Sequence, residues 1–187
     1  MKFPRLALAA ALLALATQAQ ARTLLIGDSY MRGMAPAFKS VWPDPMQERA
    51  KIGAGINDQE WARIDNPGQY SFVFVSLGIN DLPSDKQLNQ QWASKYAAQV
   101  ALLVERFQAN TYINWIMPPC PAKAAKDPLA RVRWEWLTYA INQGVKSAKR
   151  PLQTFVSTAK ICAMQTADGV HYQPQGYVQM VHTALGI

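Results

Sequence analysis

Short apolar runs alternate along the chain with longer segments whose apolar residues recur at helical spacing. The run Ser71–Leu77 is almost continuously apolar, which is typical of a strand buried on both faces. The segment Lys86–Gln108 carries apolar residues three and four positions apart, as one face of an amphipathic helix does. The predicted strands are 23–26, 47–52, 71–77, 111–117 and 152–157. The predicted helices are 31–39, 58–64, 86–108, 129–148 and 175–185.

Strands that alternate with helices over short connections predict an α/β fold with a parallel sheet and right-handed crossovers. We expect a single domain, residues 22–187, built as a three-layer α/β/α sandwich. Its five-stranded sheet is expected to have the flavodoxin-like order 2-1-3-4-5. In such a sheet ligands bind beyond the carboxyl ends of the strands, so the residues that follow the strands are the candidates for a functional site.

Four short polar motifs follow the predicted strands and should meet at that edge. They are Gly27–Ser29 after the first strand, Lys51–Asn57 after the second, Gly78–Asp81 after the third and Asp168–His171 after the fifth. In the order 2-1-3 the first strand lies between the second and the third. Ser29 is therefore expected between Gly55 and Asn80.

These residue types suit nucleophilic catalysis at Ser29. His171, one of two histidines in the chain, can accept the proton of the serine hydroxyl, and Asp168 can orient the imidazole. The N–H groups of Ser29 and Gly55, together with the side-chain amide of Asn80, can donate to the oxyanion of a tetrahedral intermediate. Chemistry of this kind needs no metal and no organic cofactor.

Taken together and in this order, the four motifs resemble those of the SGNH, or GDSL-type, serine esterases and acyl hydrolases. In that resemblance Ser29 is the nucleophile, Asn80 is the oxyanion asparagine, and Asp168 and His171 are the acid and the base. The resemblance implies an exported serine esterase that forms an acyl-enzyme on Ser29. Its substrate is expected to carry short acyl groups, such as O-acetyl esters on a cell-wall or other polysaccharide. Lipid esters, thioesters and acetyl transfer stay open as alternatives.

Two positions depart from the family pattern. Tyr30 stands where the family usually has leucine, and we expect it to shape the pocket without taking part in the chemistry. The second motif reads Gly53-Ala54-Gly55, so either glycine can be the oxyanion donor. Gly55 is preferred because the predicted helix begins just after it.

The same residues also have plainer interpretations. A serine at a strand-to-helix turn is commonly a helix N-cap. Asp28 and Asp81 are expected to organise their loops by hydrogen bonds from backbone N–H groups to their side chains. A metal-dependent phosphoesterase built on these carboxylates and His171 is disfavoured, since two-metal sites draw on more histidines. A non-catalytic binding module on the same scaffold is the third alternative.

Residues 1–21 have the features of a secretory signal peptide. Lys2 and Arg5 form a positive start, residues 6–16 are apolar, and residues 19–21 fit a signal-peptidase site. The apolar core is short for a membrane span, and no other apolar stretch could cross a bilayer. We expect a mature chain that begins at Arg22, is exported to the periplasm or the medium and is not inserted in a membrane.

The net charge is +7, but the basic residues are scattered and carry no recognisable nucleic-acid motif, so no nucleic-acid partner is expected. The partner that we expect is an acylated small molecule, glycan or lipid, and the oligomeric state is left undefined. Cys120 and Cys162 both follow strand-like apolar runs. In an oxidising compartment they are either a disulfide or two buried thiols.

Overall fold

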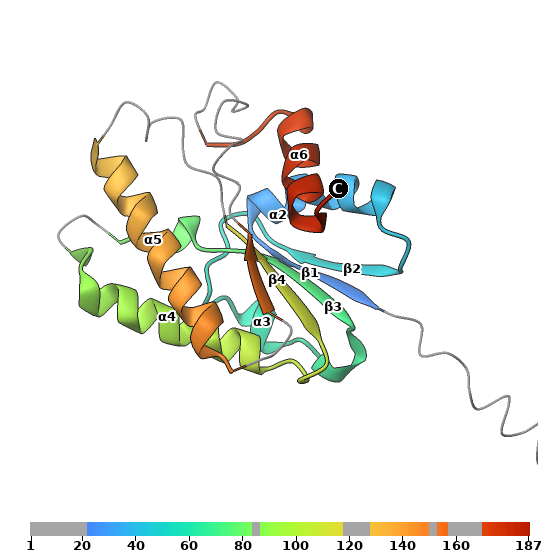
Figure 1. The fold of residues 1–187 in the computed structure, drawn as a ribbon, viewed down its shortest axis with the longest axis horizontal. Coiled ribbons are helices and arrows are strands. Elements are labelled where there is room, and N and C mark those ends of the chain that lie inside the picture. The colour runs from blue at the N-terminus through green and yellow to red at the C-terminus, as the bar shows by residue number, and fades with distance from the viewer. Residues whose placement is uncertain (1–21, 84–86, 118–127, 150–152, 157–169) are drawn as a thin grey trace, which may run out of the picture.

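A sheet lies between two layers of helices in the computed structural model, which describes residues 22–83, 87–117, 128–149, 153–156 and 170–187 (Figure 1). Within these ranges the side chains of residues 62, 153, 155 and 156 are left undescribed. The strands are β1 (Thr23–Gly27), β2 (Met46–Ala50), β3 (Phe72–Ser76), β4 (Tyr112–Ile116) and β5 (Gln153–Val156). The α-helices are α2 (Ser29–Val41), α3 (Gln59–Ala62), α4 (Gln90–Glu105), α5 (Pro128–Ser147) and α6 (Pro174–Leu185).

The strands form one sheet in the order β2-β1-β3-β4-β5, and all four neighbouring pairs are parallel. The predicted fold class and strand order are confirmed. In the register, Gly27 is paired with Ala50 on β2 and with Ser76 on β3. The three strands therefore end at the same level, and the loops that follow them begin side by side.

Each face of the sheet has its own apolar core, because side chains alternate across a strand. Leu25 and Phe74 face α2 and α6, where they join a buried cluster that includes Met31 and Met180. The opposite face packs against α3, α4 and α5. Figure 1 shows this arrangement, with α4 and α5 side by side in one layer and α2 and α6 in the other. The two helical layers leave the carboxyl edge of the sheet to the loops.

Several predicted elements were too long, and two of them show the cause. The strand predicted to reach Ile52 ends at Ala50, since the chain turns there, with Ala54 N–H donating to the Lys51 carbonyl. The helix predicted from residue 86 begins at Gln90, because Asn89 caps it by accepting a hydrogen bond from the N–H of the third helical residue. In both places a local hydrogen bond sets the boundary of the strand or helix inside the segment that the apolar spacing predicts.

Gly27 sits where the chain passes from β1 into α2. A Cβ atom on Gly27 would lie 2.3 Å from Met31 Cβ and 2.5 Å from the carbonyl oxygen of Ser76. Any larger residue would push the first turn of α2 away from β3. Glycine at this position thus lets the helix start directly at the carboxyl edge of the sheet.

Candidate active site

Ser29 and His171 are in hydrogen-bond contact at the carboxyl edge of the sheet. Ser29 is the first residue of α2, just beyond β1, and His171 lies shortly before α6. The distance from Ser29 Oγ to His171 Nε2 is 3.1 Å, although the two residues are 142 positions apart. Both residues are partly exposed, so a substrate can reach them. A hydroxyl bonded to an imidazole nitrogen can pass its proton to that nitrogen as it attacks an electrophile.

Asp28, not Ser29, caps helix α2. The Asp28 carboxylate accepts the N–H of Tyr30 at 2.9 Å, while the Asp28 carbonyl accepts the N–H of Arg32. The plainer interpretation of Ser29 as the cap is therefore wrong. Because its neighbour satisfies the helix terminus, the Ser29 hydroxyl is left to bond with His171.

Asn80 joins the loops that follow the first three strands. It lies in a short 3-10 turn, Ile79–Asp81, three residues beyond the buried Leu77, and it is exposed. Its Nδ2 donates to the Ala54 carbonyl at 3.0 Å and to Asp28 Oδ2 at 3.3 Å. The expected neighbours of Ser29 are thus brought to the same edge, with Asn80 on one side and the loop after β2 on the other.

Gly53 and Gly55 meet different requirements. Gly53 has φ +77°, and a Cβ there would meet nothing within 4 Å, so glycine serves the turn itself. At Gly55 a Cβ would lie 2.2 Å from Asp81 Oδ1. No group among the described residues accepts a hydrogen bond from the Gly55 N–H. The Gly53 N–H likewise has no acceptor among the described residues, so Gly55 stays the donor preferred from the sequence and Gly53 stays the alternative.

Asp81 and Trp61 hold the loop that carries Gly55. The Asp81 carboxylate accepts the N–H of Ile56 at 2.9 Å and the Tyr96 hydroxyl at 2.8 Å. Trp61, buried on α3, donates its indole N–H to the Gly55 carbonyl at 2.8 Å. The predicted loop-organising roles of Asp28 and Asp81 are confirmed. Sequence reasoning missed Trp61, since its spacing from the glycine motif carries no signal of contact.

Burial sets the charge of the two aspartates. Burial raises the pKa of Asp28 from its ordinary 3.8 to about 7, although the Tyr30 N–H bond opposes the rise, and the charge of Asp81 adds to it. Burial likewise raises the pKa of Asp81, and both burial and the Asp81 charge raise the pKa of Tyr96. At neutral pH the Asp28 carboxyl is therefore close to the midpoint of its titration.

Tyr30 packs its side chain against the segment that carries the candidate base. Its side chain is fully buried, and its ring lies beside those of His171 and Tyr172. The effect of Tyr30 on the shape of the pocket stays a prediction, and the contact that the structure describes is with the segment that carries the candidate base.

Three predicted residues, Asp168, Cys120 and Cys162, lie outside the described residues. Within the described part of the chain, no three His, Cys, Asp or Glu side chains are grouped to hold a metal ion. In that same part no helix combines the length and the apolar character that a bilayer span requires.

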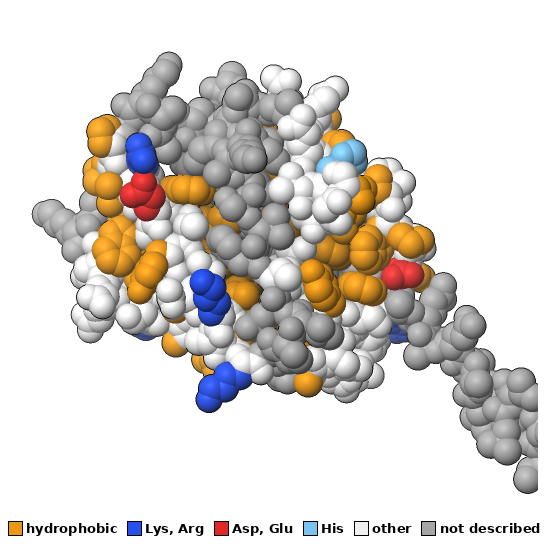
Figure 2. All heavy atoms as spheres, viewed as in Figure 1, with side chains coloured by type: hydrophobic (Ala, Val, Ile, Leu, Met, Phe, Trp, Pro, Cys, Tyr) orange, Lys and Arg blue, Asp and Glu red, His pale blue; other side chains and the backbone are white. Residues whose placement is uncertain are grey.

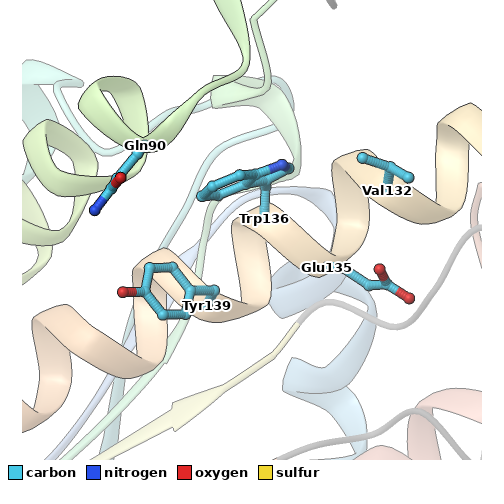
Figure 3. Close-up of a pocket in the computed structure, with 5 residues that line it drawn as sticks. All are labelled: Gln90, Val132, Glu135, Trp136 and Tyr139. Atoms are coloured by element: carbon cyan, nitrogen blue, oxygen red, sulfur yellow. The ribbon is translucent and has the colours of Figure 1, made fainter.

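A separate hollow of about 290 Å³ lies between α4 and α5. Figure 3 shows Trp136 and Tyr139 of α5 facing this space, with Gln90 on α4 across from them. Apolar side chains gather over α5 in Figure 2, where Leu129 and Val132 are exposed. The described residues that line the hollow include no serine, cysteine or histidine, whereas the candidate nucleophile and base lie at the sheet edge.

Solved structures with the same fold are SGNH/GDSL-like lipases and acylhydrolases among others. A lipase from a goat rumen metagenome is 12% identical over 89% of this chain and 96% of its own, with a TM-score of 0.66. The catalytic domain of a peptidoglycan O-acetyltransferase from Streptococcus pneumoniae is 17% identical over 89% and 93%, with a TM-score of 0.63. A candidate SGNH hydrolase from Slackia heliotrinireducens is 16% identical over 89% and 99%, also with a TM-score of 0.63.

No protein-family model matches the chain, and no curated protein matches it in sequence. The likeness is therefore one of fold: a three-layer α/β protein with a parallel sheet between two layers of helices. That architecture is the fold of the SGNH/GDSL-like hydrolases.

Proposed function

We propose that the protein is a serine ester hydrolase of the SGNH/GDSL type, which works through an acyl-enzyme on Ser29. The observation that carries this proposal is the 3.1 Å contact between Ser29 Oγ and His171 Nε2 at the carboxyl edge of the sheet. The shared fold of lipases, acylhydrolases and an acetyltransferase domain supports it.

In the first half of the reaction Ser29 Oγ attacks the ester carbonyl carbon, while His171 Nε2 takes the hydroxyl proton. The tetrahedral intermediate then collapses, His171 returns the proton to the leaving alcohol, and the acyl group stays on Ser29. In the second half His171 takes a proton from water, and the hydroxide attacks the acyl-enzyme. Collapse of the second intermediate releases the carboxylic acid and restores Ser29. No metal or organic cofactor takes part.

The oxyanion of each intermediate is assigned to the N–H groups of Ser29 and Gly55 and to the amide of Asn80. Asn80 would exchange its longer bond, the 3.3 Å contact with Asp28, for the substrate oxygen. Asp168 is assigned to the other ring nitrogen of His171, where a carboxylate holds the tautomer and stabilises the imidazolium.

The proposed substrate is a short-chain ester, such as an O-acetyl group on a cell-wall or other polysaccharide. The signal-peptide features of residues 1–21 support export to the periplasm or the medium, where such polymers are found. The similarity to the peptidoglycan O-acetyltransferase domain supports acetyl transfer as a second candidate, since the acyl-enzyme is common to both reactions.

Variants at Ser29 and His171 test the proposal. Ser29→Ala and His171→Ala should each lower ester hydrolysis by at least about a thousandfold while the circular dichroism spectrum stays unchanged. Asp168→Asn should cause an equal or smaller loss. The assay uses p-nitrophenyl esters of increasing chain length and acetylated peptidoglycan, with labelling by a fluorophosphonate as the readout of the nucleophile.

Matched controls come from α2, which contains Ser29, and from α6, which follows His171. Ser40 lies in α2 and bonds only with the carbonyl of Ala37 among the described residues, and His182 lies in α6. Ser40→Ala and His182→Ala should keep wild-type turnover and labelling. Turnover by Ser29→Ala at the wild-type rate would refute the assignment of the nucleophile.

A further inference from the structure

One side chain contacts three consecutive residues around the candidate base. The hydroxyl of Tyr30 donates to the Val170 carbonyl at 2.8 Å. Its ring centroid lies 6.1 Å from that of His171, at an interplanar angle of 37°, and 6.1 Å from that of Tyr172, at 55°. The residues before, at and after position 171 are thus all in contact with Tyr30.

Tyr30 is also rigidly tied to the nucleophile. It is the residue after Ser29 in the first turn of α2, and its own N–H is held by the Asp28 carboxylate. Its side chain is fully buried, whereas Val170 is 36% exposed at the surface. The contact therefore links a surface segment to the fixed start of a helix.

The distance between nucleophile and base governs proton transfer. A displacement of about 1 Å in such a pair can cost about a hundredfold in rate. If the backbone at His171 shifts, the imidazole shifts with it, and its 3.1 Å hydrogen bond with Ser29 lengthens. A hydrogen bond on the preceding carbonyl, together with ring contact on the imidazole itself, opposes that movement from two directions.

The geometry points to Tyr30 as a positioning residue that holds the His171 imidazole at the Ser29 hydroxyl, an inference that rests on the proposed function. Tyr30 does not touch the reacting atoms. It acts through His171, and it does so from a position where the SGNH/GDSL pattern described above usually has leucine. Leucine could fill part of the same space, but it has no hydroxyl for the Val170 carbonyl.

Two substitutions separate the hydroxyl from the ring. Tyr30→Phe keeps the ring and removes the hydrogen bond, so kcat should fall about tenfold with KM changed less than about twofold. Tyr30→Leu removes both contacts, and kcat should fall about a hundredfold. The second-order rate of fluorophosphonate labelling should fall by the same factors, because it also depends on the alignment of Ser29 with His171.

Tyr70→Phe is the matched control for loss of stability. Tyr70 is a buried tyrosine whose hydroxyl bonds with the side chain of Gln47, before β3 and away from the carboxyl edge. Both tyrosine-to-phenylalanine variants should lower Tm by a few degrees, but Tyr70→Phe should keep kcat and labelling within about twofold of wild type. All rates are measured well below the lowest Tm.

The outcomes are distinct. Wild-type kcat and labelling in Tyr30→Phe, or equal losses in Tyr30→Phe and Tyr70→Phe, would overturn the positioning role. If Tyr30→Leu does not fold, Tyr30→Phe still decides. A wild-type protein that neither hydrolyses esters nor takes the phosphonate would refute the proposed function, and the role of Tyr30 with it.

Discussion

Replacing Asp28 with asparagine should remove a decline in stability that the wild-type protein undergoes as pH rises. Burial raises the pKa of Asp28 from 3.8 to about 7 in the folded chain. Between about pH 4 and pH 7 the folded state keeps the Asp28 proton, while the unfolded state has released it. The unfolded state thus binds fewer protons in this window, and the contribution of Asp28 to the free energy of unfolding falls as pH rises.

The size of this contribution follows from the pKa rise from 3.8 to about 7. A tenfold change in proton affinity is worth about 1.4 kcal/mol, so the full decline is at most about 4 kcal/mol. Asparagine has the same shape and can still accept the Tyr30 N–H as a helix cap. Its amide would meet the Asn80 amide, which adds a penalty that does not depend on pH and therefore cancels in the comparison.

Urea unfolding followed by tryptophan fluorescence, from about pH 4 to about pH 8, measures the effect. The free energy of unfolding of Asp28→Asn relative to wild type should shift in favour of the variant by up to about 4 kcal/mol over this range. Parallel curves for the two proteins would refute the reasoning.

Asp58→Asn provides a control of opposite sign. Asp58 caps α3 in the same way that Asp28 caps α2. The hydrogen bond from Lys51 lowers the pKa of Asp58, so its contribution to stability is present above its unfolded pKa and is lost as pH falls. The free energy of unfolding of Asp58→Asn should therefore fall relative to wild type as pH rises toward and past the ordinary pKa of 3.8, so the urea curves of this pair are extended below pH 4.

Two further predictions concern the loop that carries Gly55. Gly55→Ala should lower stability by about 1–3 kcal/mol and kcat by at least about tenfold, because its Cβ would lie 2.2 Å from Asp81 Oδ1. Gly53→Ala should lower the free energy of unfolding by about 1–2 kcal/mol, because of the φ of +77° alone, and should keep kcat near wild type. Urea unfolding and steady-state kinetics measure both glycine variants. A larger loss of kcat in Gly53→Ala than in Gly55→Ala would make Gly53 the donor. Trp61→Phe removes the indole donor to the Gly55 carbonyl and should lower kcat several-fold with a loss of about 1–2 kcal/mol in stability. Unchanged kcat in that variant would show that Trp61 does not support the site.

The strands could be predicted because most are short, almost continuously apolar runs, and their order because they alternate with helices. A run such as Ser71–Leu77 has to be buried on both faces, and strand–helix alternation then leaves few topologies. In a parallel sheet the segments that follow the strands meet at one carboxyl edge, which is why the contact between Ser29 and His171 could be predicted for residues 142 positions apart.

The contacts that hold the site were not predictable in the same way. Aspartate and serine are both good helix caps, so whether Asp28 or Ser29 caps α2 depends on where the helix starts, which the tight packing at Gly27 decides. The bonds from Trp61 and Tyr30 end on carbonyl groups outside the helices and strands, and the directions of such carbonyls follow no period. Family resemblance marked Tyr30 as unusual, but burial and its hydroxyl partner came only from the structure.

Asp28, Ser29 and Tyr30 are consecutive, yet their side chains reach Asn80, His171 and Val170, from two other segments of the chain. One turn thus contains the candidate nucleophile and contacts both the candidate oxyanion amide and the segment of the candidate base. A tilt of α2 would change the distances from Ser29 to these partners, because Asn80 is also bonded to the Ala54 carbonyl of the loop after β2. Insertion or deletion of a single residue in this turn would misplace all three partners at once, so this turn should tolerate changes of sequence better than changes of length.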